Sequence, residues 1–472
     1  MSRAARSILC PCSGDYSDDD SSWDMPASAA EAYEGIPLVL EVSPHTASRP
    51  TQTRSVHVRV GERGEASDQV ISYFNNAAKT PLSKSVQEAG ECAMRQQANP
   101  WEAQQDELPR VRELYSMLLK GSSPDDSCIA PSTAFAMTMA AHNLERLGIL
   151  QKDDSILVLE NQYDSVIYPF QDVCQRTGAC LAVIPHPTVN QTWTCSILDR
   201  LNASNDSTSR IKVAILPSLH WANGSLLDLV SISEACQVHN VLLLVDATQS
   251  LGVLELDLTK VKADMVATSV HKWLLGPVGL SLVYLAPRHQ TTWLPLDQHG
   301  RARQVPPGWN ASSDMMDPIS GFYPSLFQKG AQRCDSGGKP NPILIPMIRA
   351  GLEQVTQQSL PDIQQKLVQV TNAVVSKAQP LGFVSVPGPR GPHIVGLQPG
   401  PSLIQTLTPQ VMLAMAERLA KNKGIYVAVR CGGFRISPYL DTTLHDVDRL
   451  IDALAQECLR VQEERKNDTN QL

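Results

Sequence analysis

Two short stretches of this sequence bring together groups that can do covalent and acid–base chemistry. Asp246 ends a strongly apolar run, and Ser269, His271 and Lys272 stand just before a Gly-Pro-Val-Gly turn. A lysine held among apolar residues has a lowered pKa, because burial disfavours its charged form, and such an amine can form a Schiff base. A carboxylate at the end of a buried strand either caps a turn or pairs with a cation. The two stretches therefore predict a Schiff-base site.

The order of these groups resembles a known enzyme family. The pattern D-x-x-Q-x-x-G from Asp246, followed by S-x-H-K-W-x-x-G-P-x-G from Ser269, resembles the class V branch of pyridoxal-phosphate enzymes of fold type I. That branch includes cysteine desulfurases, selenocysteine lyases, carbon–sulfur lyases, epimerase-like proteins and some aminotransferases. The resemblance extends from about Tyr73 to Leu454, and several motifs keep the family's order. It implies pyridoxal 5′-phosphate as the cofactor.

The resemblance also implies a role for individual residues. Lys272 would be the catalytic lysine that holds the cofactor and moves the Cα proton, Asp246 would pair with the pyridine nitrogen, and Gln249 would hydrogen-bond the ring hydroxyl. Arg435 would grip the substrate carboxylate with its planar guanidinium, and Asn76 would line the substrate pocket. The remaining cofactor contacts that it implies are Ser269, His271, Ser132, Thr133, Ala134, Tyr163, Asn223 and Lys339.

Some of these assignments have alternatives in the residues themselves. Ser132 to Ala134 would receive the phosphate at the start of a helix, but a serine or threonine there is also an ordinary helix cap. Trp221 stands at the family's asparagine position and Asn223 two residues later, so either would contact the cofactor. Lys339 replaces a threonine in a segment that would reach the phosphate of a partner subunit, which predicts a homodimer with shared sites.

Two departures concern the reaction. Tyr163 stands where desulfurases usually carry a histidine, and a tyrosine does not shuttle protons near neutral pH. Cys431 lies four residues before Arg435 in a predicted tight turn, not on the extended loop that carries the persulfide-forming cysteine of desulfurases. We therefore expect a transaminase or a carbon–sulfur lyase acting by β-elimination on a cysteine-type amino acid. Cysteine desulfurase, selenocysteine lyase and epimerase activities remain alternatives, and a noncatalytic scaffold is a remote one.

The elements that position these groups follow an α/β pattern. Continuous apolar runs at 155–160, 180–186, 212–217 and 241–248 predict strands buried on both faces of a mainly parallel sheet, which the resemblance extends to a seven-stranded type. We expect a disordered extension at 1–68, a large cofactor-binding domain at 69–342 and a small C-terminal α+β domain at 343–472. Helices are predicted at 226–239, from Ile343, from Pro409 after the cap Thr408, and from Leu444.

Composition limits the class of partner. The 472 residues carry 40 basic and 48 acidic side chains, a net charge of -8, so nucleic acid and anionic membrane surfaces are not expected partners. No apolar run is long enough to cross a bilayer. The 11 cysteines form no CxxC pair, which predicts reduced thiols and no metal site. We expect a cytoplasmic enzyme, with an organellar location left open by Arg3 and Arg6 near the start.

Overall fold

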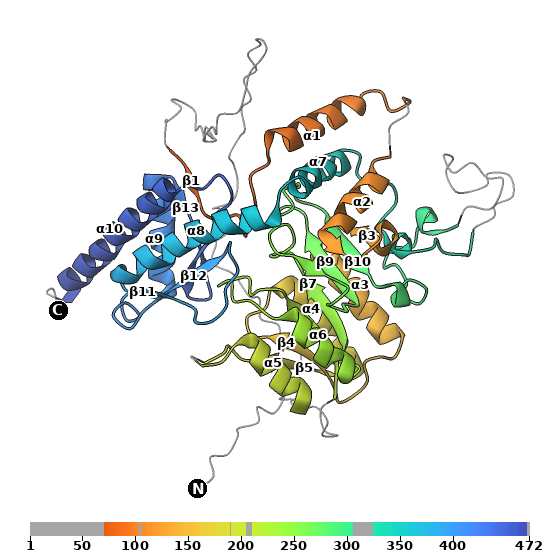
Figure 1. Cartoon of the computed structure of the whole chain (residues 1–472), viewed down its shortest axis with the longest axis horizontal. Helices are drawn as coiled ribbons and strands as arrows, with labels where there is room; N and C mark the ends of the chain where they lie inside the picture. The colour runs from red at the N-terminus through yellow and green to blue at the C-terminus, as the bar shows by residue number, and fades with distance from the viewer. Residues whose placement is uncertain (1–69, 103–105, 189, 204–209, 305–323, 470–472) are drawn as a thin grey trace, which may run out of the picture. The chain divides into compact units, whose positions relative to one another are not determined.

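The computed structural model describes residues 70–102, 106–188, 190–203, 210–304 and 324–469. The predicted disordered extension at 1–68 lies outside these described residues. The described residues from Val70 onward form one compact unit that contains a seven-stranded and a four-stranded sheet, together with two short two-stranded ones (Figure 1). The expected boundary between a large and a small domain, after residue 342, stays a prediction.

The seven-stranded sheet has the strand order β3-β10-β9-β7-β6-β4-β5. Strand β10 runs antiparallel to both of its neighbours, and every other neighbouring pair is parallel. The sheet is therefore mainly parallel, as predicted. Its strands are β3 (Ser127–Ala130), β4 (Asp154–Leu159), β5 (Cys180–Ile184), β6 (Arg210–Pro217), β7 (Leu242–Asp246), β9 (Met265–Ser269) and β10 (Ser281–Leu285).

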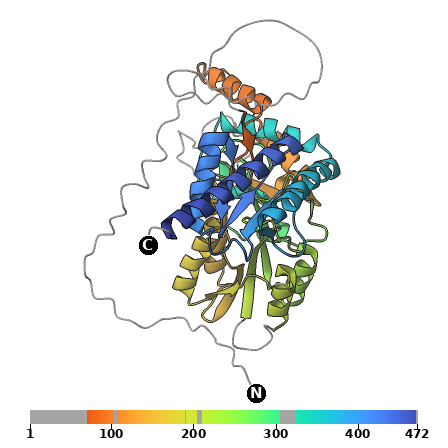
Figure 2. The same cartoon turned by 90° about the vertical axis from the view of Figure 1, so that its left-hand side faces the viewer.

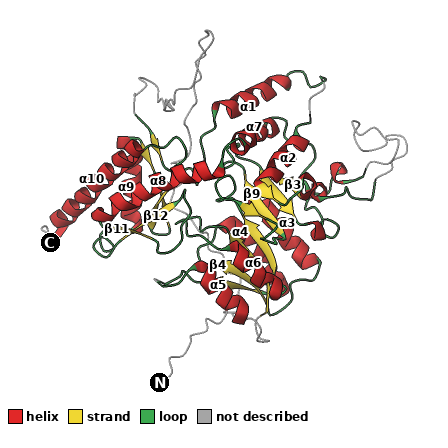
Figure 3. Ribbon diagram, viewed as in Figure 1, coloured by secondary structure: helices red, strands yellow, loops and turns green. Residues whose placement is uncertain are grey.

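Each of the four predicted apolar runs falls on a strand of this sheet. The predicted burial on both faces is wrong for β5, which lies at the edge of the sheet and has only Ile184 buried. All residues of β4 are buried, and so are the last five of β6, because helices cover both faces (Figure 3). Side chains of α2, α5, α6 and α7 pack in one apolar cluster with the sheet, and those of α3 and α4 pack in another. These helices are α2 (Leu108–Leu118), α3 (Thr133–Arg146), α4 (Asp164–Thr177), α5 (Trp193–Asn202), α6 (Leu229–Val238) and α7 (Leu344–Thr356).

The four-stranded antiparallel sheet has the order β11-β12-β15-β14 and its own apolar core. Thr408 caps its helix as predicted, since its hydroxyl accepts the Val411 N–H. Helices α8 and α10 lie side by side (Figure 2). The elements are β11 (Phe383–Ser385), β12 (Val395–Pro399), β14 (Ala428–Arg430), β15 (Gly433–Ile436), α8 (Leu360–Ala378), α9 (Pro409–Lys423) and α10 (Leu444–Thr469).

The long helical pattern from Ile343 is two helices, α7 and α8. They separate because Ser359 caps a new helix with its hydroxyl on the Asp362 N–H, and Pro361 lies in that helix's first turn. The remaining elements are α1 (Lys84–Gln96), the paired β1 (Ser72–Tyr73) and β13 (Ile425–Tyr426), the paired β2 (Leu119–Lys120) and β8 (Leu256–Asp257), and the 3-10 helices η1 (Pro124–Asp126), η3 (Pro287–His289), η4 (Gly300–Ala302), η5 (Ala331–Cys334) and η6 (Gln379–Leu381).

Among the helices in the described part of the chain, none combines the length and the apolar character that crossing a bilayer requires.

Candidate active site

The predicted site residues gather where the strands of the large sheet end. Asp246 is the last residue of β7, Ser269 is the last residue of β9, and Thr133 opens α3 directly after β3. The carboxyl ends of parallel strands share one edge of a sheet, and α/β proteins place their ligands along that edge. Arg435 comes from a different element, β15 of the four-stranded sheet. The fold thus brings residues from two sheets to one place.

The amine of Lys272 lies between groups of opposite charge. The residue is 7% exposed, and this burial lowers the pKa of its amine to about 8, an effect that the Asp246 carboxylate opposes and the Arg435 guanidinium reinforces. Burial also raises the pKa of Asp246, although its carboxylate accepts the backbone N–H of Thr248. A much larger fraction of this amine is therefore neutral at neutral pH than of an exposed lysine, and only the neutral amine can attack a carbonyl group or accept a proton.

Gln249 is buried and its side-chain amide is held on two sides. Its Oε1 accepts the indole N–H of Trp273 at 2.9 Å, and its Nε2 donates to the carbonyl oxygen of Ala77 at 2.9 Å. Because the indole only donates and the carbonyl only accepts, these partners fix which end of the amide is oxygen. One of the two Nε2 hydrogens remains for a further acceptor.

A cluster of hydroxyl groups surrounds the start of α3. The Thr133 hydroxyl lies 2.8 Å from that of Ser269, 3.2 Å from that of Ser281 and 3.4 Å from that of Thr248. The structure therefore brings Thr133 and Ser269 together as the resemblance implied. Thr248 and Ser281 were not predicted, although Thr248 stands inside the motif between Asp246 and Gln249. Polar hydrogens at the positive end of a helix are suited to an anion.

The two neighbours of Thr133 have simpler surroundings. Ser132 is exposed and caps α3, since its hydroxyl accepts the Phe135 N–H at 3.1 Å. Ser132 is therefore a helix cap, which is the alternative that the sequence offered. A phosphate could still bind there, because a capping serine leaves other backbone N–H groups of the first turn facing outward. Ala134 lies in that first turn and is half-buried.

His271 is half-buried, and its Nδ1 is a buried atom without a hydrogen-bond partner among the described residues. Burial lowers the pKa of its imidazole to about 4, with further lowering by Lys272 and Lys79. The ring is therefore neutral at physiological pH. A buried ring nitrogen without a partner is the kind of atom that a ligand satisfies.

The rings of Tyr163 and Trp221 pack against each other, and each lies near one cation of the site, Lys272 or Arg435. The Lys272 amine lies 5.3 Å from the centroid of the Tyr163 ring, which packs edge-on against Trp221 at 5.4 Å. The Arg435 guanidinium lies 5.6 Å from the Trp221 ring. Tyr163 is 40% exposed, so its ring is open to a ligand. A group that bridges Lys272 and Arg435 would lie along these two rings.

Arg435 is 2% exposed and only partly satisfied by the protein. It donates to the carbonyl oxygen of Trp221 at 3.3 Å and to Oδ1 of Asn75 at 3.2 Å, while its buried Nε has no partner among the described residues. Burial lowers its pKa to about 10. The arrangement suits an anion. Asn76 instead donates to the Ser437 carbonyl at 3.0 Å, so Asn75, which the sequence did not single out, reaches Arg435.

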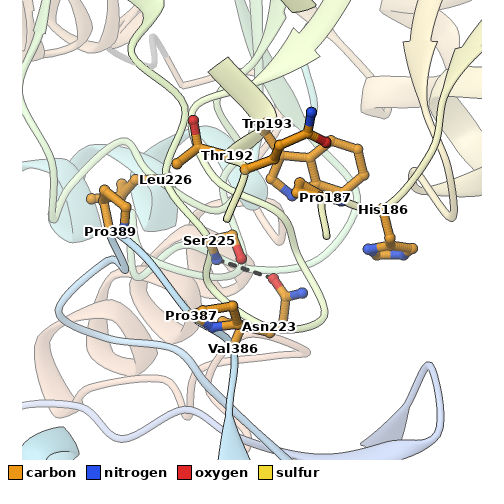
Figure 4. A pocket seen from close by; sticks show the side chains of 11 residues that line it. His186, Pro187, Thr192, Trp193, Asn223, Ser225, Leu226, Val386, Pro387 and Pro389 are labelled. Carbon is orange, nitrogen blue, oxygen red and sulfur yellow. Dashed lines mark hydrogen bonds between the residues drawn. The ribbon is translucent and has the colours of Figure 1, made fainter. Parts of the chain in front are cut away.

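Asn223 and Lys339 are the two remaining residues that the resemblance assigned to the cofactor. Asn223 is buried, accepts the Ser225 N–H at 3.0 Å, and lines a cavity of about 60 Å³ with His186 and Trp193 (Figure 4). Lys339 is exposed in the segment after η5. The assignments of both residues to the cofactor stay predictions.

Cys431 lies in the two-residue turn between β14 and β15, as the sequence predicted. Arg430 and Gly433 pair across this hairpin, and both turn residues have positive φ, 47° at Cys431 and 73° at Gly432. Partial burial raises the pKa of the Cys431 thiol, although Arg430 and Arg435 lower it. The turn is too short to move the thiol independently of the strands.

Comparisons with known proteins agree with this arrangement. The family model "Aminotransferase class-V" matches residues 72–450. A cysteine desulfurase of Escherichia coli O8 (strain IAI1) is 21% identical over 285 residues, which are 60% of this chain and 65% of that relative. A solved cystine C–S lyase in complex with its product cysteine persulfide has a TM-score of 0.69 at 20% identity, covering 81% of this chain and 97% of that one. A variant with glycine covalently linked to its pyridoxal-phosphate cofactor has a TM-score of 0.69 at 19% identity, covering 82% and 96%. These likenesses confirm the predicted fold type.

Proposed function

The chain belongs to the aminotransferase class-V family, whose members are pyridoxal-phosphate-dependent enzymes, and we propose that it cleaves the carbon–sulfur bond of a cysteine-type amino acid by β-elimination. The observation that carries this proposal is the buried Lys272 amine, within electrostatic reach of both the Asp246 carboxylate and the Arg435 guanidinium. The carboxylate suits the pyridine nitrogen of the cofactor, and the amine suits its aldehyde. The guanidinium suits the carboxylate of the substrate.

The site residues fit pyridoxal phosphate. The Asp246 carboxylate would meet the pyridine nitrogen, and the remaining Nε2 hydrogen of Gln249 would meet the ring hydroxyl. The hydroxyl cluster at Thr133 and the unpartnered Nδ1 of His271 would face the phosphate, and Tyr163 would lie against the ring. Bound there, the cofactor would accept the electron pair released at Cα.

The chain's own residues would divide the work on the substrate. Arg435 would bind the carboxylate through its unpartnered Nε, with its guanidinium oriented by Trp221 and Asn75. Lys272 would take the Cα proton, since its lowered pKa leaves it partly neutral. The sulfur would leave with the electron pair of the C–S bond. With cysteine and water, the products are pyruvate, ammonia and hydrogen sulfide.

The place of Cys431 supports a lyase over a desulfurase. A desulfurase needs a thiolate that reaches the substrate sulfur, and here the nearby thiol of Cys431 is in a two-residue hairpin turn and has a raised pKa. We expect cysteine or a cysteine S-conjugate to give pyruvate and sulfur product in equal amounts. Persulfide with alanine would instead indicate a desulfurase, and a new amino acid formed from an added 2-oxo acid would indicate a transaminase.

Changing Cys431 to serine tests this choice directly. Serine keeps the size and polarity of the side chain but cannot form a persulfide, so we expect kcat for pyruvate formation to stay within about twofold of the wild type, as for a side chain outside the chemistry. Cys195, which is exposed on α5, gives a matched control as Cys195→Ser. If only the Cys431 variant lost activity while remaining folded and loaded with cofactor, the lyase proposal would be wrong.

The rate at which the apoprotein attaches the cofactor should depend on pH, and the midpoint of this dependence should lie near the pKa of the Lys272 amine. Burial lowers the pKa of this amine to about 8, so the neutral form that attacks the aldehyde increases as the pH rises through that value. At pH 7 about one amine in ten would be neutral, against about one in 3,000 for an ordinary lysine. Stopped-flow absorbance after mixing apoprotein with pyridoxal phosphate measures this rate. A midpoint above pH 10 would contradict the described burial of Lys272.

We also propose that the enzyme is a cytoplasmic homodimer. The Gly276–Gly279 turn after Lys272 presents Val278 at 54% exposure, and Trp101 and Leu326 are 78% and 66% exposed. A partner subunit that covered these side chains would remove their apolar surface from water. The described cysteines are free thiols, which is typical of a reducing compartment.

A further inference from the structure

His393 is a fully buried residue that contacts the candidate site from the side of the four-stranded sheet. It lies two residues before β12 and is 0% exposed. Its Nε2 lies 2.6 Å from the main-chain oxygen of Gln249. Since a carbonyl oxygen only accepts, Nε2 carries the hydrogen, and Nδ1 is left without a partner among the described residues. Burial lowers the pKa of His393 to about 4, so the ring donates as neutral imidazole.

Trp273 connects His393 to the side chain of Gln249. The imidazole packs edge-on against the indole with ring centroids 4.4 Å apart, and the indole N–H donates to Gln249 Oε1. Gln249 is therefore held twice, at its main chain by His393 and at its side chain by Trp273. Both contacts are buried, where hydrogen bonds restrict geometry strongly. With Ala77 on Nε2, they determine where the remaining amide hydrogen points.

The same segment also connects to the residue that would bind the substrate carboxylate. Gly396, three residues after His393, pairs with Arg435 across β12 and β15. The His393 hydrogen bond thus joins the strand pair that carries Arg435 to the turn that carries Gln249. These two groups come from different sheets, and their separation has to match one substrate and cofactor.

We propose that His393 is a positioning residue, which holds Gln249 so that its free amide hydrogen meets the hydroxyl of the cofactor ring and keeps that contact in register with Arg435. This inference rests on the proposed function, because it assigns Gln249 to the cofactor. It predicts that His393 changes the electronic state of the bound cofactor only through Gln249, without touching the cofactor itself.

The test replaces His393 by phenylalanine and by glutamine in the full-length protein loaded with pyridoxal phosphate. Phenylalanine keeps the ring packing against Trp273 but removes the donor to Gln249, whereas glutamine keeps an amide donor. The readout is the pH midpoint of the cofactor's visible absorbance band, since a donor to the ring hydroxyl affects how readily the neighbouring Schiff-base nitrogen holds its proton. We expect a shift of about half a pH unit or more in His393→Phe and a smaller one in His393→Gln.

Gln249→Ala separates positioning from a general structural role. If His393 acts through the Gln249 amide, His393→Phe adds no shift in the Gln249→Ala background, so the two effects are not additive. Equal shifts in both backgrounds, or none in either, would overturn the proposal. His393→Leu provides the donor-free variant if His393→Phe does not fold, as judged by its thermal unfolding. A wild-type protein without any cofactor band would instead overturn the proposed function.

Discussion

Replacing Lys272 by alanine should abolish turnover, with kcat at least about 10⁴-fold lower, because the amine serves both as the attachment point and as the base. The protein should still fold, since burial already disfavours the charged amine and lowers its pKa to about 8. Reduction with borohydride followed by peptide mass spectrometry is the measurement. In the wild type, the peptide containing Lys272 should carry the reduced cofactor, and in the variant no peptide should.

Lys262→Ala is the matched control for this experiment. Lys262 lies three residues before β9, at the opposite end of that strand from Lys272. Its amine donates to the Thr259 carbonyl. We expect this variant to keep both turnover and the labelled peptide. Persistent labelling of Lys272→Ala at another lysine, together with measurable turnover, would show that the Schiff-base residue had been misassigned.

The sequence located β4, β5, β6 and β7 because the signal of an apolar strand is local, whereas β3, β9 and β10 were not predicted as strands. Strands buried on both faces must be continuously apolar, so the runs at 155–160 and 212–217 located β4 and β6 closely. The direction of a strand leaves no such local trace. The antiparallel direction of β10, which follows the connection 270–280, was therefore not predicted. Gly279 in this connection has a φ of 113°, which residues other than glycine rarely adopt.

In the candidate site, too, residues within one motif could be predicted, whereas contacts between distant segments could not. The motif around Lys272 places the lysine and the aspartate because both follow strand ends of one sheet. Contacts between distant segments had no signal in a single sequence. Asn75 meets Arg435 from 360 residues away, and His393 meets Gln249 from 144 residues away. Neighbours such as Asn75 and Asn76 point to different partners, which only the backbone path decides.

Among conservative changes in the site, Arg435→Lys should weaken substrate binding the most. Arg435→Lys keeps a positive charge but removes the planar fork, and with it the simultaneous contacts to the Trp221 carbonyl, Asn75 and a carboxylate. Hydrogen bonds to charged groups contribute about 1.5–3 kcal/mol each, so kcat/KM for the amino acid should decrease by about 10- to 100-fold. Cofactor loading should not change, since the proposed function assigns the guanidinium to the substrate carboxylate and not to the cofactor.

A comparison of two substrates tests this role of Arg435. The wild type should prefer cysteine over cysteamine, which lacks the carboxylate, and Arg435→Lys should lose most of that preference while its activity toward cysteamine stays nearly constant. A structural defect would lower both activities together. Arg418→Lys is the control, because Arg418 forms an ion pair with Glu457 between α9 and α10 and should leave the preference intact. Equal losses for both substrates in Arg435→Lys would contradict this role of Arg435. The unpartnered buried Nε of Arg435 would then need a different ligand, because a desolvated guanidinium without an anion is costly to keep.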